Sequence, residues 1–378
     1  IQALRAHVLL KRNRDYVVAD GAVVLVDGVT GRLMPGRRYD DGLHQALEAK
    51  EGQLIGEESR ILASITFQTF LRSYDKLAGM TGTALQDLEE YRDVYGLDTI
   101  AVAPHRPVIR VDDVQHHASR ADKIEAIMRA VEDANTTRQP VLVGAPTVEQ
   151  SEALAAELIS RGWHRHEFER DDASSRDATG TAPDKVFTLL NARYHAREAD
   201  IIAMAGLPGA VTIATAMAGR GTDIKLGGGD PSLRQQVATS GGLLVIGTEH
   251  HDHARLDDQL RGRAGRQGDP GRSIFHAAPD DELLKNARNA PPSLETKRSI
   301  GAVDGRADID AAQSQNARAS SEQRFSLSRF DQVIDLQRRV IYDRRLGIRD
   351  DLAPLAHVAS LREETIDDLL NKFTPVKG

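Results

Sequence analysis

The sequence lacks cysteine altogether. Disulfide bonds and thiolate metal sites are therefore excluded, and the composition fits a reducing compartment. No stretch approaches the ~18 consecutive apolar residues of a membrane-spanning helix. We expect no secretory signal, because Lys11 and Arg12 interrupt the apolar run Leu9-Leu10. The first residue is Ile1 and not Met, which favours a fragment or a processed chain.

Aromatic residues and positive charge are also scarce. Aromatic side chains make up 4% of the chain, and the net charge is −7. Proteins that bind nucleic acid usually present a basic surface, and single-strand binders add aromatic stacking platforms. The composition therefore argues against a dedicated nucleic-acid partner. With 378 residues, of which 40% are hydrophobic, the chain can bury the cores of two or three domains.

A phosphate-binding loop is missing as well. No GxxxxGK[ST] sequence occurs anywhere in the chain. The acidic run 280–282 follows Pro279, which is the wrong context for a strand-end acidic pair that holds Mg²⁺. We therefore expect that the chain by itself does not hydrolyse ATP.

Short apolar runs alternate with helical patterns between residues 122 and 278. This alternation predicts an α/β fold in which a parallel sheet is covered by helices on both faces. The polar segment 171–183 is expected to be a surface loop. The predicted strands are 140–144, 186–190, 211–215 and 242–247, and the predicted helices are 148–161, 197–204 and 254–263.

The flanking regions have other patterns. Residues 16–27 predict a β-hairpin with a tight turn at Asp20-Gly21. Helical spacing predicts a helix at 57–77 that ends in a loop at 79–83. Residues 289–318 read as a polar connector with partial helix, and 320–346 predict a long amphipathic helix. Its expected buried stripe consists of Phe330, Val333, Ile334, Leu336, Val340 and Ile341.

The strongest chemical signal is the Gly- and Arg-rich run 259–269. Arg263 and Arg266 project from the Gly-rich end of a predicted helix, and guanidinium groups stay charged and bind phosphate oxygens in a bidentate manner. In motor ATPases such an arginine stabilises the charge that develops on a γ-phosphate held by another domain. The simpler interpretation is a basic helix whose charges are solvated.

A second signal, residues 218–223, follows the predicted strand 211–215. Gly221 and Asp223 would then lie at the carboxyl edge of the sheet, where α/β proteins bind ligands. Asp223 could accept hydrogen bonds from a ribose or orient the arginines. The simpler interpretation is an ordinary turn between a strand and a helix.

The run His250-His251-Asp252-His253 resembles a metal-binding cluster. Its three histidines cannot all lie on one helix face, and no further ligand is evident. We interpret it as a polar helix entry and predict no metal site.

Ten segments together resemble the SecA family of preprotein translocase ATPases over about residues 4–347. The runs Gly79-Met80-Thr81-Gly82-Thr83 and 41–45 are the most specific of them. The segments are 30–32, 36–38, 41–46, 48–52, 63–68, 76–84, 191–195, 217–224, 258–271 and 335–342.

The resemblance implies a superfamily-2 helicase-like motor in which two RecA-like domains clamp ATP. Residues 1–60 would return from the preprotein cross-linking domain, and 61–84 would close the first motor domain. Residues 85–286 would form the second motor domain, and 287–378 would form a connector, a helical scaffold and a truncated C-terminal region. The family's arginine-finger motif falls on Arg263 and Arg266. Nucleotide contacts fall on Asp269, Gly221, Asp223, Gln259 and Gly265.

The resemblance also implies cofactors, partners and a location. ATP and Mg²⁺ would be bound mainly by an N-terminal half that is missing here. The partners would be that half, preproteins, a SecY-type membrane channel and, in a homodimer, a second copy. The motor would be cytoplasmic and peripheral on the inner face of the cell membrane.

Some features depart from the family pattern. Residues 249–257 carry fewer arginines than housekeeping members, the connector matches poorly, and the end has no room for a full wing domain. These departures favour an accessory, actinobacterial-type paralogue. Two alternatives stay open at this point: a superfamily-2 nucleic-acid helicase, and a non-catalytic fragment.

Overall fold

The computed structural model describes residues 1–27, 33–57, 64–166, 184–191, 198–215, 221–289, 305–350 and 354–373. It divides into two compact units. Unit 1 comprises Ile1–Ile61, Met80–Asp87 and Thr99–Ala319, and unit 2 comprises Leu62–Gly79, Leu88–Asp98 and Ser320–Gly378. The predicted loop 171–183 lies outside the described residues, as do 30–32, 58–63, 192–195, 217–220 and most of the connector before residue 305. The four predicted domains and the three boundaries between them stay a prediction.

The N-terminal hairpin is confirmed. Strands β1 (Tyr16–Ala19) and β2 (Ala22–Val26) pair antiparallel, and β3 (Leu33–Met34) extends the sheet in the order β1-β2-β3. The turn residues Asp20 and Gly21 have φ values of 50° and 75°. A two-residue turn in this left-handed conformation matches the twist of the strands that it joins. Helices α1 (Gln2–Val8) and α2 (Leu43–Lys50) complete the small core of this region.

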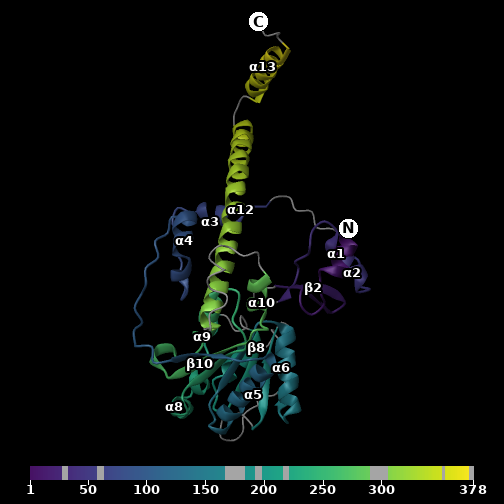
Figure 1. Ribbon diagram of the computed structural model, residues 1–378. Helices are drawn as coiled ribbons and strands as arrows, with labels where there is room; N and C mark the ends of the chain where they lie inside the picture. Colours follow the sequence, from purple (N-terminus) through teal and green to yellow (C-terminus); the bar gives the residue numbers. More distant parts are fainter. Residues whose placement is uncertain are drawn as a thin grey trace. The chain divides into compact units, whose positions relative to one another are not determined.

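The main element of unit 1 is a seven-stranded sheet with the order β4-β10-β9-β5-β8-β7-β6. Figure 1 labels two of its strands, β8 and β10. All six pairings in it are parallel, as the alternation of strands and helices predicted. The four predicted strands are present, and three further strands were not predicted. The strands are β4 (Val111–His116), β5 (Val141–Ala145), β6 (His164–Arg165), β7 (Val186–Leu190), β8 (Val211–Thr215), β9 (Leu243–Gly247) and β10 (Gly271–Ala277).

Helices cover both faces of this sheet. Val141 and Val143 contribute to one core cluster together with α5 (Arg120–Thr136) and α6 (Val148–Ser160). Leu142 contributes to a second cluster, which contains side chains of α7 (Glu198–Met204), α8 (Pro231–Thr239) and α9 (Ala254–Arg261). Successive residues of a strand point to opposite faces, so the two clusters lie on opposite sides of the sheet. The three layers are therefore helix, parallel sheet and helix.

Unit 2 is helical. It contains α3 (Phe67–Arg72), α4 (Leu88–Tyr95), α13 (Pro354–Phe373) and the part of α12 (Gly305–Asp350) after Ala319. Glu90 on α4 accepts hydrogen bonds from Arg324 on α12 at 2.6 Å. Asp331 on α12 accepts one from Thr66, the N-cap of α3, also at 2.6 Å. None of the helices in the described part of the chain is long and apolar enough to cross a membrane.

Two helix predictions need correction. Within the predicted helix 57–77, the described residues form only the six-residue α3, because Thr66 caps its start and the helix ends at Arg72. The long helix is real but begins at Gly305, inside the predicted polar connector, and ends at Asp350. Residues 305–319 contain five alanines, the best helix formers, and Ile309 and Ala312 are buried against Ala277 and Leu283, so the helix extends where the apolar pattern is weak.

The expected buried stripe of the long helix is not buried. Ile334 is 51% exposed, Ile341 58% and Phe330 74%, and Val333, Leu336 and Val340 are exposed to a similar degree. Helical spacing determines which residues share a face, but a neighbouring element must cover that face before it is buried. No element among the described residues covers these six side chains.

Candidate functional site

The two predicted arginines lie in the connection between α9 and β10. Helix α9 ends at Arg261, and Gly265 then takes a left-handed conformation with φ 68°. A Cβ atom at Gly265 would lie 2.6 Å from the Cβ of Arg110, so the backbone passes close to that residue. The Arg110 guanidinium donates to the carbonyl of Ala264 at 3.1 Å, which fixes this connection against the residues before β4.

Each arginine has a defined partner. Arg263 is 9% exposed, and its Nη1 donates to the carbonyl of Thr222 at 3.0 Å. Arg266 donates from Nε to the carbonyl of Gly262 at 2.7 Å and from Nη1 to Asp223 Oδ1 at 2.5 Å. The side chain of Arg266 is 39% exposed and that of Asp223 is 53% exposed. The site therefore presents one buried guanidinium and one accessible guanidinium.

The described segment that begins at Gly221 does not stay at the carboxyl edge of the sheet, where Gly221 and Asp223 were predicted. Residues 216–220 are outside the described part, and the chain resumes at Gly221 as an irregular segment. The backbone N–H of Gly227 donates to the carbonyl of Gly206 at 2.7 Å. Gly206 lies between α7 and β8, at the amino end of that strand. The segment from Gly221 thus runs back along the sheet toward its amino edge, and this path brings Asp223 to Arg266.

The other predicted residues lie near the arginines with different partners. Asp269 forms an ion pair with Arg234 on α8, and its backbone N–H donates to the Arg266 carbonyl at 2.9 Å. Gln259 is half-buried on α9. The structure thus brings Asp223, Arg263 and Arg266 into one cluster, with Asp269 beside it in the same connection.

His250 and His251 of the histidine-rich run form a largely buried polar cluster with Asp257, a residue that the sequence patterns did not indicate. Nδ1 of His250 and Nδ1 of His251 each lie 2.6 Å from the Asp257 carboxylate, which is 1% exposed. Burial alone would raise the pKa of this carboxyl, but the hydrogen bonds from His250 and His251 hold its pKa well below the usual range. Within the described ranges, no group of three or more His, Asp or Glu residues is arranged to hold a metal ion.

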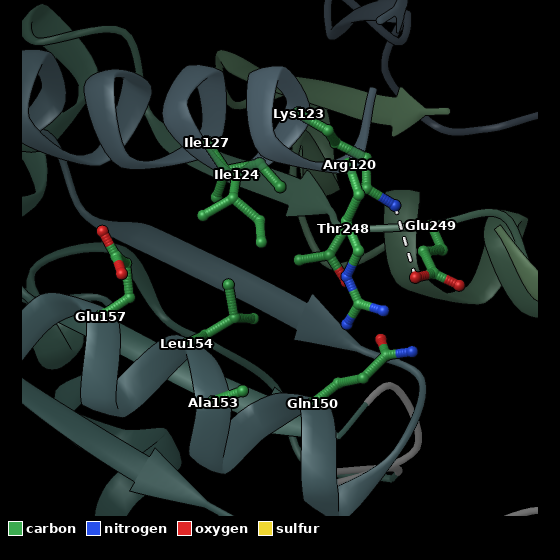
Figure 2. A pocket seen from close by; sticks show the side chains of 10 residues that line it. All are labelled: Arg120, Lys123, Ile124, Ile127, Gln150, Ala153, Leu154, Glu157, Thr248 and Glu249. Carbon is green, nitrogen blue, oxygen red and sulfur yellow. Dashed lines mark hydrogen bonds and ion pairs between the residues drawn. The ribbon is translucent and has the colours of Figure 1, made fainter. Parts of the chain in front are cut away.

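A second feature that the sequence reasoning missed is a pocket of about 260 Å³ beside a buried ion cluster (Figure 2). Lys123 is 3% exposed and forms ion pairs with Glu249, at 3.3 Å, and with Asp281. Burial raises the pKa of Glu249, although Lys123 opposes this effect. The pocket lies between α5 and α6, away from the predicted arginines. It is lined by Arg120, Lys123, Ile124, Ile127, Gln150, Ala153, Leu154, Glu157, Thr248 and Glu249.

The sheet order and the helices on both faces define a RecA-like α/β domain. Three family models agree with this class and specify it further. The SecA P-loop domain model matches residues 107–237 and 231–291, the SecA preprotein cross-linking domain model matches 1–48, and the SecA Wing and Scaffold domain model matches 306–378. The chain belongs to the SecA family.

Relatives of known name support an accessory paralogue. The chain is 55% identical to protein translocase subunit SecA 2 of Rhodopseudomonas palustris (strain BisA53), over 99% of this chain and 44% of that protein. It is 39% identical to SecA 1 of the same organism, over 99% of this chain and 46% of that protein. It is 44% identical to SecA of Caldicellulosiruptor saccharolyticus, over 99% of this chain and 42% of that protein. The chain therefore spans less than half the length of these relatives.

Solved structures add no argument about function. The structure of the E. coli DEAD-box protein SrmB aligns with a TM-score of 0.30 and 16% identity, over 49% of this chain and 88% of that one. The nucleic-acid helicase alternative gains no support from so weak a likeness.

Proposed function

We propose that this chain is the arginine-bearing half of an ATP-driven preprotein translocase. In the complete motor, ATP binding and hydrolysis move unfolded proteins across the cytoplasmic membrane. The family membership and the relatives named as translocase subunits support this proposal. Because the chain contains no GxxxxGK[ST] sequence, we propose that another half of the motor supplies the phosphate-binding loop.

The observation that carries the proposal is the cluster of Arg263, Arg266 and Asp223. Two guanidinium groups lie within one short connection, and Arg266 is held by two hydrogen bonds while its side chain remains accessible. An exposed ion pair of this kind stabilises a fold by only ~0–1 kcal/mol. A γ-phosphate can therefore replace Asp223 as the partner of Arg266 at low energetic cost. Arg266 would then stabilise the charge that develops during phosphoryl transfer.

The residues present fit a role beside a nucleotide. Arg263 and Arg266 would face the phosphates, and Asp269, Gly221, Gln259 and Gly265 would line the same region. Bound Mg²⁺ would neutralise phosphate charge; its ligands are proposed to lie mainly on the other half of the motor. The further partners proposed are preproteins, a SecY-type channel on the inner face of the cell membrane, and a second copy of the motor.

Replacement of Arg266 by Ala in the complete motor tests the proposed function. We expect the ATP turnover rate to fall by roughly 10³–10⁵-fold, because a finger arginine acts on the transition state. ATP affinity should stay nearly unchanged. Arg272→Ala is a suitable control, because Arg272 is an exposed arginine on β10 that pairs with Asp113 at 3.3 Å. Turnover within tenfold of the wild type would exclude the proposed role of Arg266.

The chain alone provides a second test. We expect the purified 378-residue chain to show no ATPase activity by itself. A mixture of the chain with the phosphate-binding half should hydrolyse ATP. A pull-down with that half as bait should retain the chain. Robust ATP hydrolysis by the chain alone would show that it binds phosphate through a site other than a GxxxxGK[ST] loop.

A further inference from the structure

The carboxylate of Asp257 accepts four hydrogen bonds in the interior of unit 1. Oδ1 accepts from the backbone N–H of His251 at 2.9 Å and from its Nδ1 at 2.6 Å. Oδ2 accepts from Nδ1 of His250 at 2.6 Å and from Nε2 of Gln313 at 2.9 Å. Three of these donors come from the strand-to-helix connection after β9. The fourth comes from α12, which lies much further along the chain.

Gln313 makes a second contact with the same connection. Its Nε2 also donates to the carbonyl of His251 at 2.8 Å, and the residue is 6% exposed. A side-chain amide has two N–H donors on one nitrogen, so Gln313 can satisfy a buried carboxylate and a buried carbonyl together. A glutamate at this position would place an acceptor against two acceptors. A leucine would leave both oxygens without this donor.

The cluster lies at the start of the helix that leads to the arginines. Asp257 is in the first turns of α9, and Arg263 follows shortly after that helix ends. His250 stacks on Phe275 of β10 with ring centroids 4.9 Å apart. The Arg261 guanidinium lies 4.5 Å from the centroid of the same Phe275 ring. Both ends of α9 are therefore fixed, the first by Asp257 and the last by Arg261.

We propose that Gln313 is a positioning residue that links the start of α12 to the placement of Arg263 and Arg266. The inference rests on the proposed function. A shift of α12 would pull on the Asp257 carboxylate, and α9 would transmit the displacement to the connection that holds the arginines. A full set of hydrogen bonds in a buried site makes this link stiff, because any break leaves a buried polar group without a partner.

Two substitutions of Gln313 in the complete motor test the link. In Gln313→Glu we expect the turnover rate to fall at least about fivefold at about pH 8, while the KM for ATP stays within about twofold. The loss should be smaller at about pH 6, because a protonated carboxyl regains one donor. In Gln313→Leu the loss should be independent of pH. Ser314→Ala is the matched control, because Ser314 is the next residue on α12 and is exposed.

Hydrogen exchange in the same variants separates positioning from general stability. We expect faster exchange of the amides of residues 262–268 in both Gln313 variants and unchanged exchange in the strands β5 and β8. Wild-type turnover in Gln313→Glu at about pH 8, or faster exchange throughout the sheet, would overturn the inference. If the Arg266→Ala variant keeps its ATP turnover, the proposed function fails. If Arg266→Ala loses turnover but Gln313→Glu keeps it, only the inference about Gln313 fails.

Discussion

Arg266 and Asp223 form an ion pair across 43 residues of sequence, with 2.5 Å between Nη1 and Oδ1. Arg266 is anchored at the same time by its Nε to the carbonyl of Gly262. The two contacts fix the direction of the guanidinium. Because the side chain is exposed, it can also bind an anion that attracts it more strongly than the Asp223 carboxylate does. This contact is the one that an arginine-orienting role of Asp223 requires, and that role, one of the two expected from the sequence, stays a prediction.

A double-mutant cycle tests this orienting role. In the complete motor, we expect Asp223→Ala to lower the turnover rate about tenfold, a change of ~1.4 kcal/mol in the activation free energy. The effect should vanish in the Arg266→Ala background, because coupled residues do not contribute independently. Steady-state ATPase rates of the four proteins give the answer. Additive losses would show that Asp223 acts without Arg266.

Gly265 is expected to tolerate no side chain. Its φ of 68° costs an L-residue roughly 1–2 kcal/mol, and the new Cβ would lie 2.6 Å from the Cβ of Arg110. Gly265→Ala should therefore lower the unfolding free energy of the chain by at least about 1 kcal/mol in a urea titration. Gly347→Ala is the opposite control, because Gly347 is inside α12 with open space around it, and it should stabilise by ~0.5–1 kcal/mol. A neutral Gly265→Ala would contradict the described geometry of this connection.

The regular part of the fold was predictable from short-range patterns. The strands around Val143, Leu189, Ile213 and Val245 are short and mostly apolar, which is the pattern of strands buried on both faces. Strand β4 was missed because its sequence, Val-Asp-Asp-Val-Gln-His, is polar and its side chains are mostly not buried. It lies at the edge of the sheet, beside β10, where burial does not constrain composition.

The candidate site was predictable in its residue types but not in its contacts. The run 259–269 identified Arg263 and Arg266, but the partner of Arg266 depends on the return of the chain after β8. The link from Gln313 to Asp257 joins segments that no local pattern connects. Buried polar contacts of this kind have no sequence period, so only the three-dimensional structure identifies them.

The buried Lys123 is expected to be essential for stability. Lys123→Met leaves Glu249 and Asp281 without their cation, and loss of one partner from a buried ion cluster costs ~3–5 kcal/mol. Lys285→Met, at an exposed position on α10 (Glu282–Asn289), should change the unfolding free energy by less than ~0.5 kcal/mol. Urea titrations of the chain would measure both effects.

The Lys123→Met variant should also show a distinct pH dependence. Burial raises the pKa of Glu249, so the native carboxyl binds its proton more tightly than the unfolded one. The unfolding free energy then falls as the pH rises from the ordinary glutamate pKa through the raised value. Without Lys123 this effect grows, and the variant should be less destabilised at about pH 5 than at about pH 8. An equal loss of unfolding free energy at both pH values would contradict this expectation. It would show that the variant does not keep a charged Glu249 carboxylate in a buried position.

The exposed face of α12 leads to the last prediction. Ile334 and Ile341 are 51% and 58% exposed, so Ile334→Asp and Ile341→Asp should leave the melting temperature of the chain nearly unchanged. Exposed apolar residues in a row mark a surface that contacts another molecule or domain. In the complete motor, the same substitutions should therefore impair protein export while ATP hydrolysis continues or rises. Ile127→Asp is the matched control, because Ile127 is 1% exposed and should unfold the chain. A parallel loss of export, hydrolysis and melting temperature in the α12 variants would show that this face only stabilises the fold.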